Sequence, residues 1–556
     1  MAIHTLEFRA ADGEGTSYAA YVVTLTVTPV QLNGVYQLST KEELFWFRDA
    51  VNGGQYSLNA ALTQDIDLEG TADWVRIANG SSSNSSRAYT GTFDGQNHTI
   101  KNLSIKNTSS SSGKYLALFE RVVGKGRICS LKLENVQIEG YQYAAAFVAY
   151  NAGTVENCHV VSGRISAKYS NYGGICAETT STSKIIGCSN AAAIEGDGSY
   201  LGGIAGANAG EITDCVNTGR VAGAKSYQTE AVGIAGRNSK LIDRCANTGE
   251  VYAESARVGG IAGGATSSSS QVKNSWNGGS VTLNVRISSS DPQVGGIVGY
   301  TQGTVENCCS TGTITVTMDN ADGKTVGSIA GKADGSKAAV TNCYASVAAP
   351  FNQAVGSGST AAITNCYYVG EEDAFDGTTV KTAEEMKQAA FAAQLGEEFK
   401  SGCQSLPVLT WQEAAPHTEV EIPAVPATCT ETGLTAGKKC SVCGEILVEQ
   451  VEIPKLTRPT PVLPATPSKP GAPKDDKPAA GSSFTDVKTG IWYAEAVKYV
   501  SEKGLMNGTS ASSFGPSATT TRGMIVTILA RIEGVNTSTR AQVAAILMRF
   551  MENIAK

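Results

Sequence analysis

The stretch LGGIAGANAGEITDCVNTGRVAG, residues 201–223, carries the pattern that decides the fold. A short apolar pulse flanked by glycine is centred on Ile204, and the motif I-T-D-C follows it and ends at Cys215. Both motifs recur, with steps of 27 to 36 residues between successive pulse centres. Two motifs that share one drifting period indicate a repeat architecture. The pulse centres are Phe147, Ile175, Ile204, Ile234, Ile261, Ile297 and Ile329; the cysteines behind them are Cys158, Cys188, Cys215, Cys245, Cys308, Cys343 and Cys366, with Ser275 in the slot between Cys245 and Cys308.

Each repeat holds short β-branched runs separated by Gly, Asn or Ser, and such a unit is too small to bury a core by itself. We therefore expect the repeats to stack as coils about 4.8 Å apart, with the pulse residues pointing inward. Parallel neighbours lie farther apart than the roughly 3.8 Å between Cβ atoms that a disulfide prefers, and buried thiols behave as small hydrophobes. The cysteine column is thus expected to be packing, and metal or redox chemistry is the alternative. Ser275 favours packing.

The repeats from Leu118 to Cys366 resemble GLUG repeats, which occur on bacterial surface proteins. The resemblance implies a mainly β fold, a right-handed parallel β-helix. Residues 62–68 and 89–105 are similar to the first strands of that family.

Two segments predict caps for the ends of this solenoid. STKEELFWFRDAVN, residues 39–52, predicts a helix whose capping box joins Ser39 and Glu42. Residues 382–400 predict a second helix, and LPVLTWQ, residues 406–412, resembles the closing strand that follows GLUG arrays.

A change of composition after Pro416 introduces a small cysteine-bearing module. C-S-V-C-G at Cys440 to Gly444 resembles a zinc knuckle, in which two thiolates grip one metal ion. Cys429, Cys440, Cys443 and His417 are the predicted zinc ligands. The alternatives are a disulfide from Cys429 to one of the other two cysteines, or reduced thiols. A proline-rich run then predicts an extended spacer.

The last part of the chain resembles one S-layer-homology (SLH) module over residues 484–533. The motifs are F-T-D-V, W-Y-A-E-A-V-K-Y-V, G-L-M-N-G, F-G-P and T-R, in that order. The resemblance implies binding to pyruvylated secondary cell-wall polysaccharide. The residues that we expect to bind this polymer are Asp486, Trp492, Gly508, Arg522 and Arg540.

The T-R motif also has a physical interpretation of its own. Thr521 precedes an apolar helical pattern as an N-cap would, so Arg522 would lie beside free backbone N–H groups and form an anion site with them. Thr539 and Arg540 repeat this arrangement. The segment departs from the family because Met524 and Gln542 replace the usual Glu, and because one module and only the end of another are present.

The net positive charge of the C-terminal segment agrees with an anionic binding partner. The chain carries a formal charge of −7, yet residues 484–556 hold eight Lys or Arg against five Asp or Glu. Neither a secretion signal nor a stretch long enough to span a membrane is found, so the N-terminus is expected to be incomplete and no membrane or nucleic-acid partner is expected.

No catalytic motif or metal-hydrolase motif is found. Asp65, Asp67 and Asp94 are the carboxylates that could suggest glycan chemistry, but D-I-D and F-D-G are typical of strand ends and turns. The sequence predicts an outer face of the β-helix that is rich in Ser, Thr and Asn and has no clear aromatic cluster. We therefore expect a secreted, extracellular, wall-attached protein of a Gram-positive bacterium, an adhesin that displays its β-helix to an unknown host or environmental glycan or protein, and not an enzyme. The alternatives are a polysaccharide lyase or glycosidase and a passive surface coat.

These observations predict seven segments. They are 1–30, remnant strands of an upstream β domain; 31–115, an N-terminal cap; 116–370, the GLUG β-helix; 371–413, a C-terminal cap; 414–456, the Cys/His module; 457–483, the linker; and 484–556, an incomplete SLH module.

Overall fold

A computed structural model describes most of the chain, which forms two compact units, Met1–Leu456 and Thr457–Lys556. The described residues are 3–8, 21–26, 28–69, 74–80, 87–110, 114–223, 229–254, 257–285, 292–317, 325–350, 353–370, 377–428, 430–456, 484–487, 494–502, 509–510 and 512–515.

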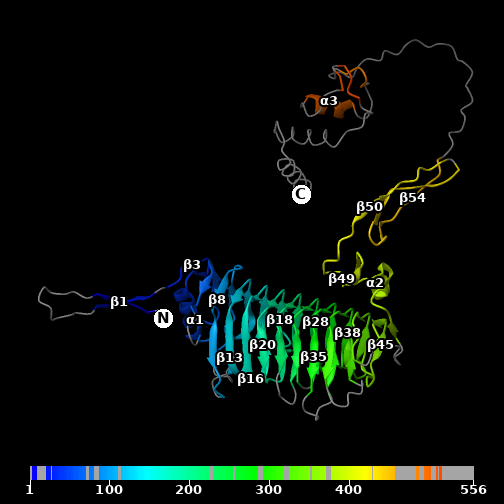
Figure 1. Cartoon of the computed structure of the whole chain (residues 1–556). Helices are drawn as coiled ribbons and strands as arrows, with labels where there is room; N and C mark the ends of the chain where they lie inside the picture. Colours follow the sequence, from blue (N-terminus) through cyan, green and yellow to red (C-terminus); the bar gives the residue numbers. More distant parts are fainter. Residues whose placement is uncertain are drawn as a thin grey trace, which may run out of the picture. The chain divides into compact units, whose positions relative to one another are not determined.

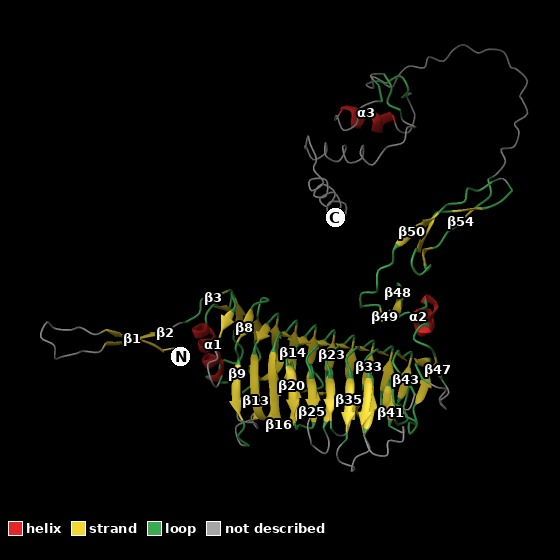
Figure 2. Ribbon diagram, in the orientation of Figure 1, coloured by secondary structure: helices red, strands yellow, loops and turns green. Residues whose placement is uncertain are grey.

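The first unit is dominated by a parallel β-helix of about eight turns, which confirms the predicted fold (Figure 1). Successive coils pair strand to strand with equivalent residues in register, so three parallel faces run along the solenoid (Figure 2). In the coil that follows Cys188, the chain crosses the first face once, the second twice and the third twice before it reaches Cys215.

The first face has one short strand per coil. Its strands are β6 (Ile66–Asp67), β8 (Thr99–Lys101), β12 (Lys132–Glu134), β15 (His159–Val160), β19 (Ser189–Asn190), β24 (Val216–Asn217), β29 (Ala246–Asn247), β34 (Trp276–Asn277), β39 (Cys309–Ser310), β44 (Tyr344–Ala345), β46 (Cys366–Tyr368) and β47 (Thr378–Val380).

The second face has longer or paired strands. They are β9 (Ser104–Asn107), β10 (Lys114–Leu116), β13 (Val136–Ala145), β16 (Gly163–Gly173), β20 (Ala193–Gly196), β21 (Tyr200–Gly202), β25 (Val221–Gly223), β26 (Glu230–Val232), β30 (Val251–Ala253), β31 (Arg257–Gly259), β35 (Val281–Asn284), β36 (Gln293–Gly295), β40 (Ile314–Thr317) and β41 (Val326–Gly327).

The third face completes the coil. It comprises β3 (Gln31–Leu32), β4 (Val35–Leu38), β5 (Asn59–Leu62), β7 (Thr92–Asp94), β11 (Phe119–Cys129), β14 (Val148–Glu156), β17 (Cys176–Thr179), β18 (Lys184–Ile186), β22 (Ala205–Asn208), β23 (Glu211–Thr213), β27 (Ala235–Asn238), β28 (Leu241–Asp243), β32 (Ala262–Ala265), β33 (Gln271–Lys273), β37 (Val298–Thr301), β38 (Thr304–Glu306), β42 (Ala330–Ala333), β43 (Ala339–Thr341) and β45 (Ala362–Thr364).

The core follows the two predicted columns. All seven pulse residues are fully buried, and the backbone N–H of Ile204 donates to the carbonyl of Ile234 one coil on, at 3.0 Å. The column cysteines are buried free thiols. Ser275 is buried in the same column, and its hydroxyl donates to the carbonyl of Lys273 as the thiols do to their own neighbours. Packing is therefore the role of this column.

The backbone conformation of the residue before each column position, whether that position holds cysteine or Ser275, explains why asparagine is common there. This residue has a positive φ in coil after coil, for example 57° at Asp214, 45° at Asn274 and 52° at Asn307. Asn tolerates this left-handed conformation better than most residues. Its side chain also bonds between coils, because Asn307 Nδ2 donates to Asn274 Oδ1 at 3.0 Å.

A second, buried asparagine ladder was not predicted. Asn190, Asn217, Asn247 and Asn277 stack in the first face, and each amide donates to the next along the solenoid at 2.8–2.9 Å. The ladder also explains the glycine directly before the pulse centre, since a Cβ on Gly203 would lie 2.2 Å from Cγ of Asn217 and one on Gly233 would lie 2.2 Å from Cγ of Asn247.

The N-terminal end is closed by helix α1 (Lys41–Asn52), which buries Leu44, Phe47 and Val51. The predicted capping box is one residue off: Thr40 is the N-cap and Glu43 its partner. This register is the one that turns those three apolar residues toward the coils. Before the cap, β1 (Ile3–Phe8) pairs antiparallel with β2 (Tyr21–Thr26), within the segment expected to be remnant strands.

The predicted second cap helix is shorter than expected. Residues 382–400 form a 3-10 turn (Glu385–Lys387), helix α2 (Ala389–Leu395) and the start of β48 (Phe399–Gly402), because Gly396, at a φ of 115°, ends the helix. The closing strand is present as β49 (Ser405–Leu409), which pairs antiparallel with β48. Phe391, Leu395 and Leu409 bury themselves against the last coils.

The cysteine module has little core of its own. It holds β50 (Glu419–Ile422), β51 (Gly433–Leu434), β52 (Gly437–Cys440), β53 (Ile446–Val448) and β54 (Glu452–Ile453), in two small antiparallel sheets. Several of its large apolar side chains are exposed: Val420, Val425, Val442, Ile446, Val448, Val451 and Leu456. In the second unit, helix α3 (Ala494–Glu502) is described.

Candidate functional site

The described part of the SLH segment is organised around Asp486. Its carboxylate accepts backbone hydrogen bonds from Phe514 and Gly515, each at 2.8 Å, and one from the Ser513 hydroxyl at 2.7 Å. These bonds, led by the one from Phe514, lower the pKa of Asp486 to about 2. The carboxylate therefore links the F-T-D-V motif, residues 484–487, to the F-G-P turn that begins at Phe514.

A small core lies around this tie. Phe484, Val487, Ala494 and Val497 are buried together, and the Phe484 ring lies 5.4 Å from that of Phe514. The other predicted polymer-binding residues, Trp492, Gly508, Arg522 and Arg540, lie outside the described residues. Their contact with a polymer, and that of Asp486, stays a prediction.

A cluster of three thiols and one imidazole lies where the C-terminal cap meets the cysteine module. Ligand atoms of Cys403, His417, Cys440 and Cys443 all lie within 4.8 Å of one another. The Sγ atoms of Cys403 and Cys440 are 3.6 Å apart, and Sγ of Cys443 is 3.5 Å from Nδ1 of His417. Three of the four predicted zinc ligands are thus together, while Cys429 lies outside the described residues.

Sequence reasoning missed Cys403 because it lies in the turn between β48 and β49, a segment assigned to the cap. The signal that could have found it is the fourth ligand that the C-S-V-C-G knuckle requires. The knuckle itself is well formed, because Gly444 has a φ of 78° and the Val442 N–H donates to Sγ of Cys440 at 3.4 Å. Hydrogen bonds from the backbone N–H groups of Cys443 and Val442 lower the pKa of the Cys440 thiol to about 5.

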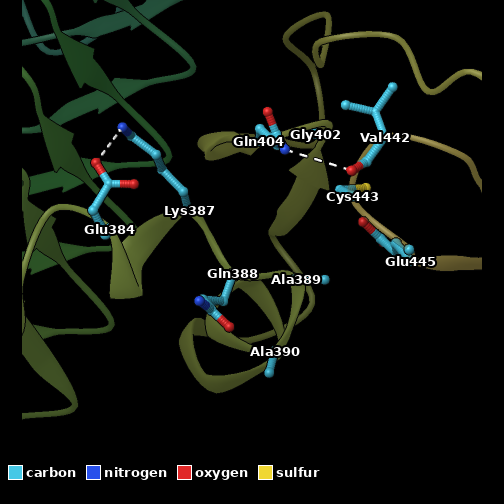
Figure 3. A pocket seen from close by; sticks show the side chains of 11 residues that line it. Glu384, Lys387, Gln388, Ala389, Ala390, Gly402, Gln404, Val442, Cys443 and Glu445 are labelled. Atoms are coloured by element: carbon cyan, nitrogen blue, oxygen red, sulfur yellow. Dashed lines mark hydrogen bonds and ion pairs between the residues drawn. The ribbon is translucent and has the colours of Figure 1, made fainter.

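Polar groups surround the cluster. Glu445 Oε2 lies 3.6 Å from Nε2 of His417, and the Ser401 hydroxyl donates to the other carboxylate oxygen at 2.5 Å. A groove of about 640 Å³ opens beside Cys443. Figure 3 shows Val442, Cys443 and Glu445 on one side of this groove and Lys387 and Gln388 of the cap on the other.

The three carboxylates that could have suggested glycan chemistry accept hydrogen bonds within turns or from the next coil. Asp65 accepts from the Thr99 N–H, Asp67 from the Glu69 N–H and the Asn102 amide, and Asp94 from the Gln96 N–H. These bonds lower the pKa values of Asp65 and Asp67, so both are ionised near neutral pH and neither is a proton donor there.

The expectation of no clear aromatic cluster needs correction at one place, because the Tyr115 and Tyr143 rings stack 4.6 Å apart and Arg121 lies 5.6 Å over the Tyr115 ring. One register position of the third face, called the outer column here, brings aromatic and charged side chains into line across the coils. Arg121 lies 4.3 Å over the Tyr150 ring and Arg257 4.7 Å over the Tyr300 ring. The outer column consists of Arg121, Tyr150, Glu178, Ala207, Arg237, Gly264, Tyr300 and Lys332. The sequence could not align them because the coils differ in length.

Family comparisons agree with both resemblances. Residues 483–523 match the S-layer homology domain, and residues 197–222 and 291–315 match the GLUG motif. The chain carries GLUG motifs and an S-layer homology domain. S-layer homology domains attach proteins to cell-wall polysaccharide at the cell surface, and the matched families are attachment and repeat types, not catalytic ones.

The chain is also similar to other proteins, at low identity or over a short stretch. A 135-residue stretch is 30% identical to halomucin of Haloquadratum walsbyi, which corresponds to 24% of this chain and only 1% of halomucin. A solved structure named as an immunoglobulin A1 protease from Bacteroides ovatus has 19% identity and a TM-score of 0.35 over 68% of this chain and 93% of its own. Another IgA1 protease has 16% identity and a TM-score of 0.35 over 62% of this chain and 24% of its own. Within the described residues, no helix combines the length and apolar character that a membrane crossing needs.

Proposed function

We propose that this protein is held on the wall of a Gram-positive bacterium by pyruvylated secondary cell-wall polysaccharide and displays its β-helix for adhesion to a glycan or protein. The S-layer homology match at residues 483–523 carries the proposal. In the polymer, the carboxylate of each pyruvyl ketal is the anionic group that Arg522, at a predicted helix N-terminus, would bind.

Two further observations support surface display. Apolar caps cover both ends of the β-helix, so the large free surface of its described residues is the outside of the coils. The outer column places two half-buried tyrosines, Tyr150 and Tyr300, and the guanidinium groups of Arg121 and Arg237 on that outside, and such aromatic and charged groups recur at recognition surfaces.

Cosedimentation with purified wall sacculi tests the attachment. The full chain is compared with a chain ending at Ser483, which retains the compact first unit. We expect the full chain to pellet with the sacculi and the shortened chain to stay in solution. The full chain should also stay in solution when the sacculi have had their pyruvyl groups removed.

Arg522→Ala and Arg531→Ala form a matched pair in the same experiment. Both remove one positive charge from the same segment, but only Arg522 belongs to the predicted site. We expect R522A to reduce retention strongly and R531A to leave it nearly unchanged. Equal retention of the full and shortened chains would remove wall attachment from the proposal.

The displayed surface is tested separately with a glycan array. The full chain is compared with a variant that carries Tyr150→Ala and Tyr300→Ala in the outer column. Signals that disappear in the variant would place glycan recognition on this column, and a pattern that is the same for both proteins would exclude it.

A further inference from the structure

The distances within the Cys/His cluster match those of one tetrahedral metal ion. Zinc bonds of about 2.3 Å to sulfur and 2.0–2.1 Å to nitrogen put two sulfurs about 3.8 Å apart, and a sulfur and a nitrogen about 3.6 Å apart. The corresponding distances are 3.6 Å between Cys403 and Cys440 and 3.5 Å between Cys443 and His417. Four side chains from two structural segments, the turn that holds Cys403 and the module that holds the other three, thus converge as a first coordination shell would require.

The surroundings of His417 fit the same geometry. Its Nδ1 faces Cys443, and its Nε2 faces a carboxylate oxygen of Glu445 that is buried and accepts no hydrogen bond within the described residues. A carboxylate at Nε2 favours the proton there and leaves the Nδ1 lone pair for a metal. The Ser401 hydroxyl donates to the other carboxylate oxygen and so holds Glu445 in place to orient the imidazole of His417.

A disulfide explains the cluster less well. The 3.6 Å between the nearest sulfurs is well beyond the roughly 2.05 Å of a disulfide bond. Three thiols also leave one unpaired after any bridge, and a bridge gives the convergent His417 no role. A metal ion uses all four groups.

The module supplies a reason for such a site. With its apolar side chains largely exposed, residues 414–456 have too little core to stay folded without a further constraint. Cys403 belongs to the cap, whereas the other three residues belong to the module. A metal ion at this point would join the two, and the groove beside Cys443 gives it access.

We propose that Cys403, His417, Cys440 and Cys443 bind one Zn²⁺ ion as a structural site that fastens the module to the C-terminal cap of the β-helix. Four protein ligands complete the tetrahedral shell and leave no open position for a substrate. On binding, the thiols that are still protonated release their protons to solvent, and Glu445 orients His417.

The test uses the full chain, purified under reducing conditions, with Zn²⁺ and Co²⁺ as probes. We expect one zinc per chain by elemental analysis. The Co²⁺ form should show the visible bands of a tetrahedral site and charge-transfer bands for three thiolates. Absence of bound zinc and of Co²⁺ bands in the reduced chain would overturn the proposal. A mass lower by two hydrogens in a sample prepared without reductant, together with no zinc uptake after that sample is reduced, would identify a disulfide instead.

Cys403→Ser and Cys429→Ser are the matched pair, because they distinguish the structural ligand set from the set predicted from sequence. We expect C403S to weaken zinc binding and to lose thiolate charge-transfer intensity, while C429S keeps both. If C429S loses the metal and C403S keeps it, the proposed ligand set is wrong. The wild-type Co²⁺ spectrum decides the ligand types even where a variant folds poorly.

Glu445→Gln tests the positioning role. The variant keeps all four ligands, so its Co²⁺ spectrum should be that of the wild type, while its zinc affinity should fall about 10- to 100-fold. An unchanged affinity would remove Glu445 from the site but would leave the four ligands to be judged by the spectra.

Discussion

The cysteines of the β-helix and those of the module have different surroundings. In the coils, the column position holds a buried thiol in every repeat except that of Ser275, and these thiols donate to backbone carbonyls, as Cys215 does to Thr213 at 3.2 Å. In the cluster, thiols from two structural segments face one another and an imidazole. The first arrangement is stabilised by repetition and burial, whereas the second lacks a core. The difference teaches that convergence, and not the presence of cysteine, marks a candidate ligand site.

The sharpest test of this comparison is a large-to-small substitution in each region. Ile234→Ala removes a fully buried side chain from a stacked column and should lower the free energy of unfolding by about 2–5 kcal/mol. Ile446→Ala in the module removes a side chain that is 51% exposed and should cost less than about 0.5 kcal/mol. Urea denaturation measures both, and equal costs would break the comparison.

Glu230 tests how far the coils tolerate a buried charge. It is 5% exposed, it pairs with Arg257 at 2.8 Å, and burial raises its pKa to about 7. The folded state therefore binds the proton more tightly than the unfolded state, so stability present below about pH 4.5 is lost as pH rises to 7. The full shift corresponds to roughly 3 kcal/mol.

Glu230→Gln should remove this loss. We expect the stability difference between pH 5 and pH 8, measured by urea denaturation, to be smaller in E230Q than in the wild type. Burial also raises the pKa of Glu120 to about 7, so Glu120 contributes the same pH-dependent loss of stability to both proteins. An unchanged difference would show that Glu230 ionises as easily in the coil as in water.

The buried asparagine ladder offers a smaller effect. Asn247→Ala removes an amide that donates to Gly249 and Asn277 and accepts from Asn217, and it leaves buried polar groups unpaired. We expect a loss of about 2 kcal/mol in unfolding free energy. Asn277→Ala, at the end of the ladder, removes fewer bonds and should cost less. The reverse order would contradict the ladder's contribution.

The smallest effect is expected for a column thiol. Cys245→Ser copies the natural Ser275, whose hydroxyl accepts from the Cys245 N–H and donates to Lys273. We expect the free energy of unfolding, measured by urea denaturation, to change by less than about 1 kcal/mol. A large loss would mean that the thiols do more than fill space.

The repeated part of the fold was predictable because period and burial are linked. The positions of Ile204 and Cys215 recur from coil to coil, so the inward direction of their side chains follows from stacking alone. The ladder of Asn217 and its neighbours was not predicted, because N-T-G resembles an ordinary turn until the coils are placed in register. The cap helix was overestimated because Gly396 could not be identified as its end from the apolar pattern.

The candidate zinc site was only partly predictable. His417, Cys440 and Cys443 lie in one short module, and the knuckle motif pointed to them. Cys403 precedes Cys440 by 37 residues, within a different structural segment, and only the tertiary fold brings the two together. Nothing local in K-S-G-C-Q-S indicates a ligand.

The in-register stacking of the coils also makes the length of the solenoid a quantity that can change in whole steps. Each coil contacts mainly its two neighbours, and the two caps bind coils whose chemistry repeats along the axis. Loss of residues 216–245 would join Cys215 to Ala246 and restore the same motif. Duplication or deletion of gene segments of this size would therefore lengthen or shorten the reach of the protein by about 4.8 Å at a time, without redesign of either end.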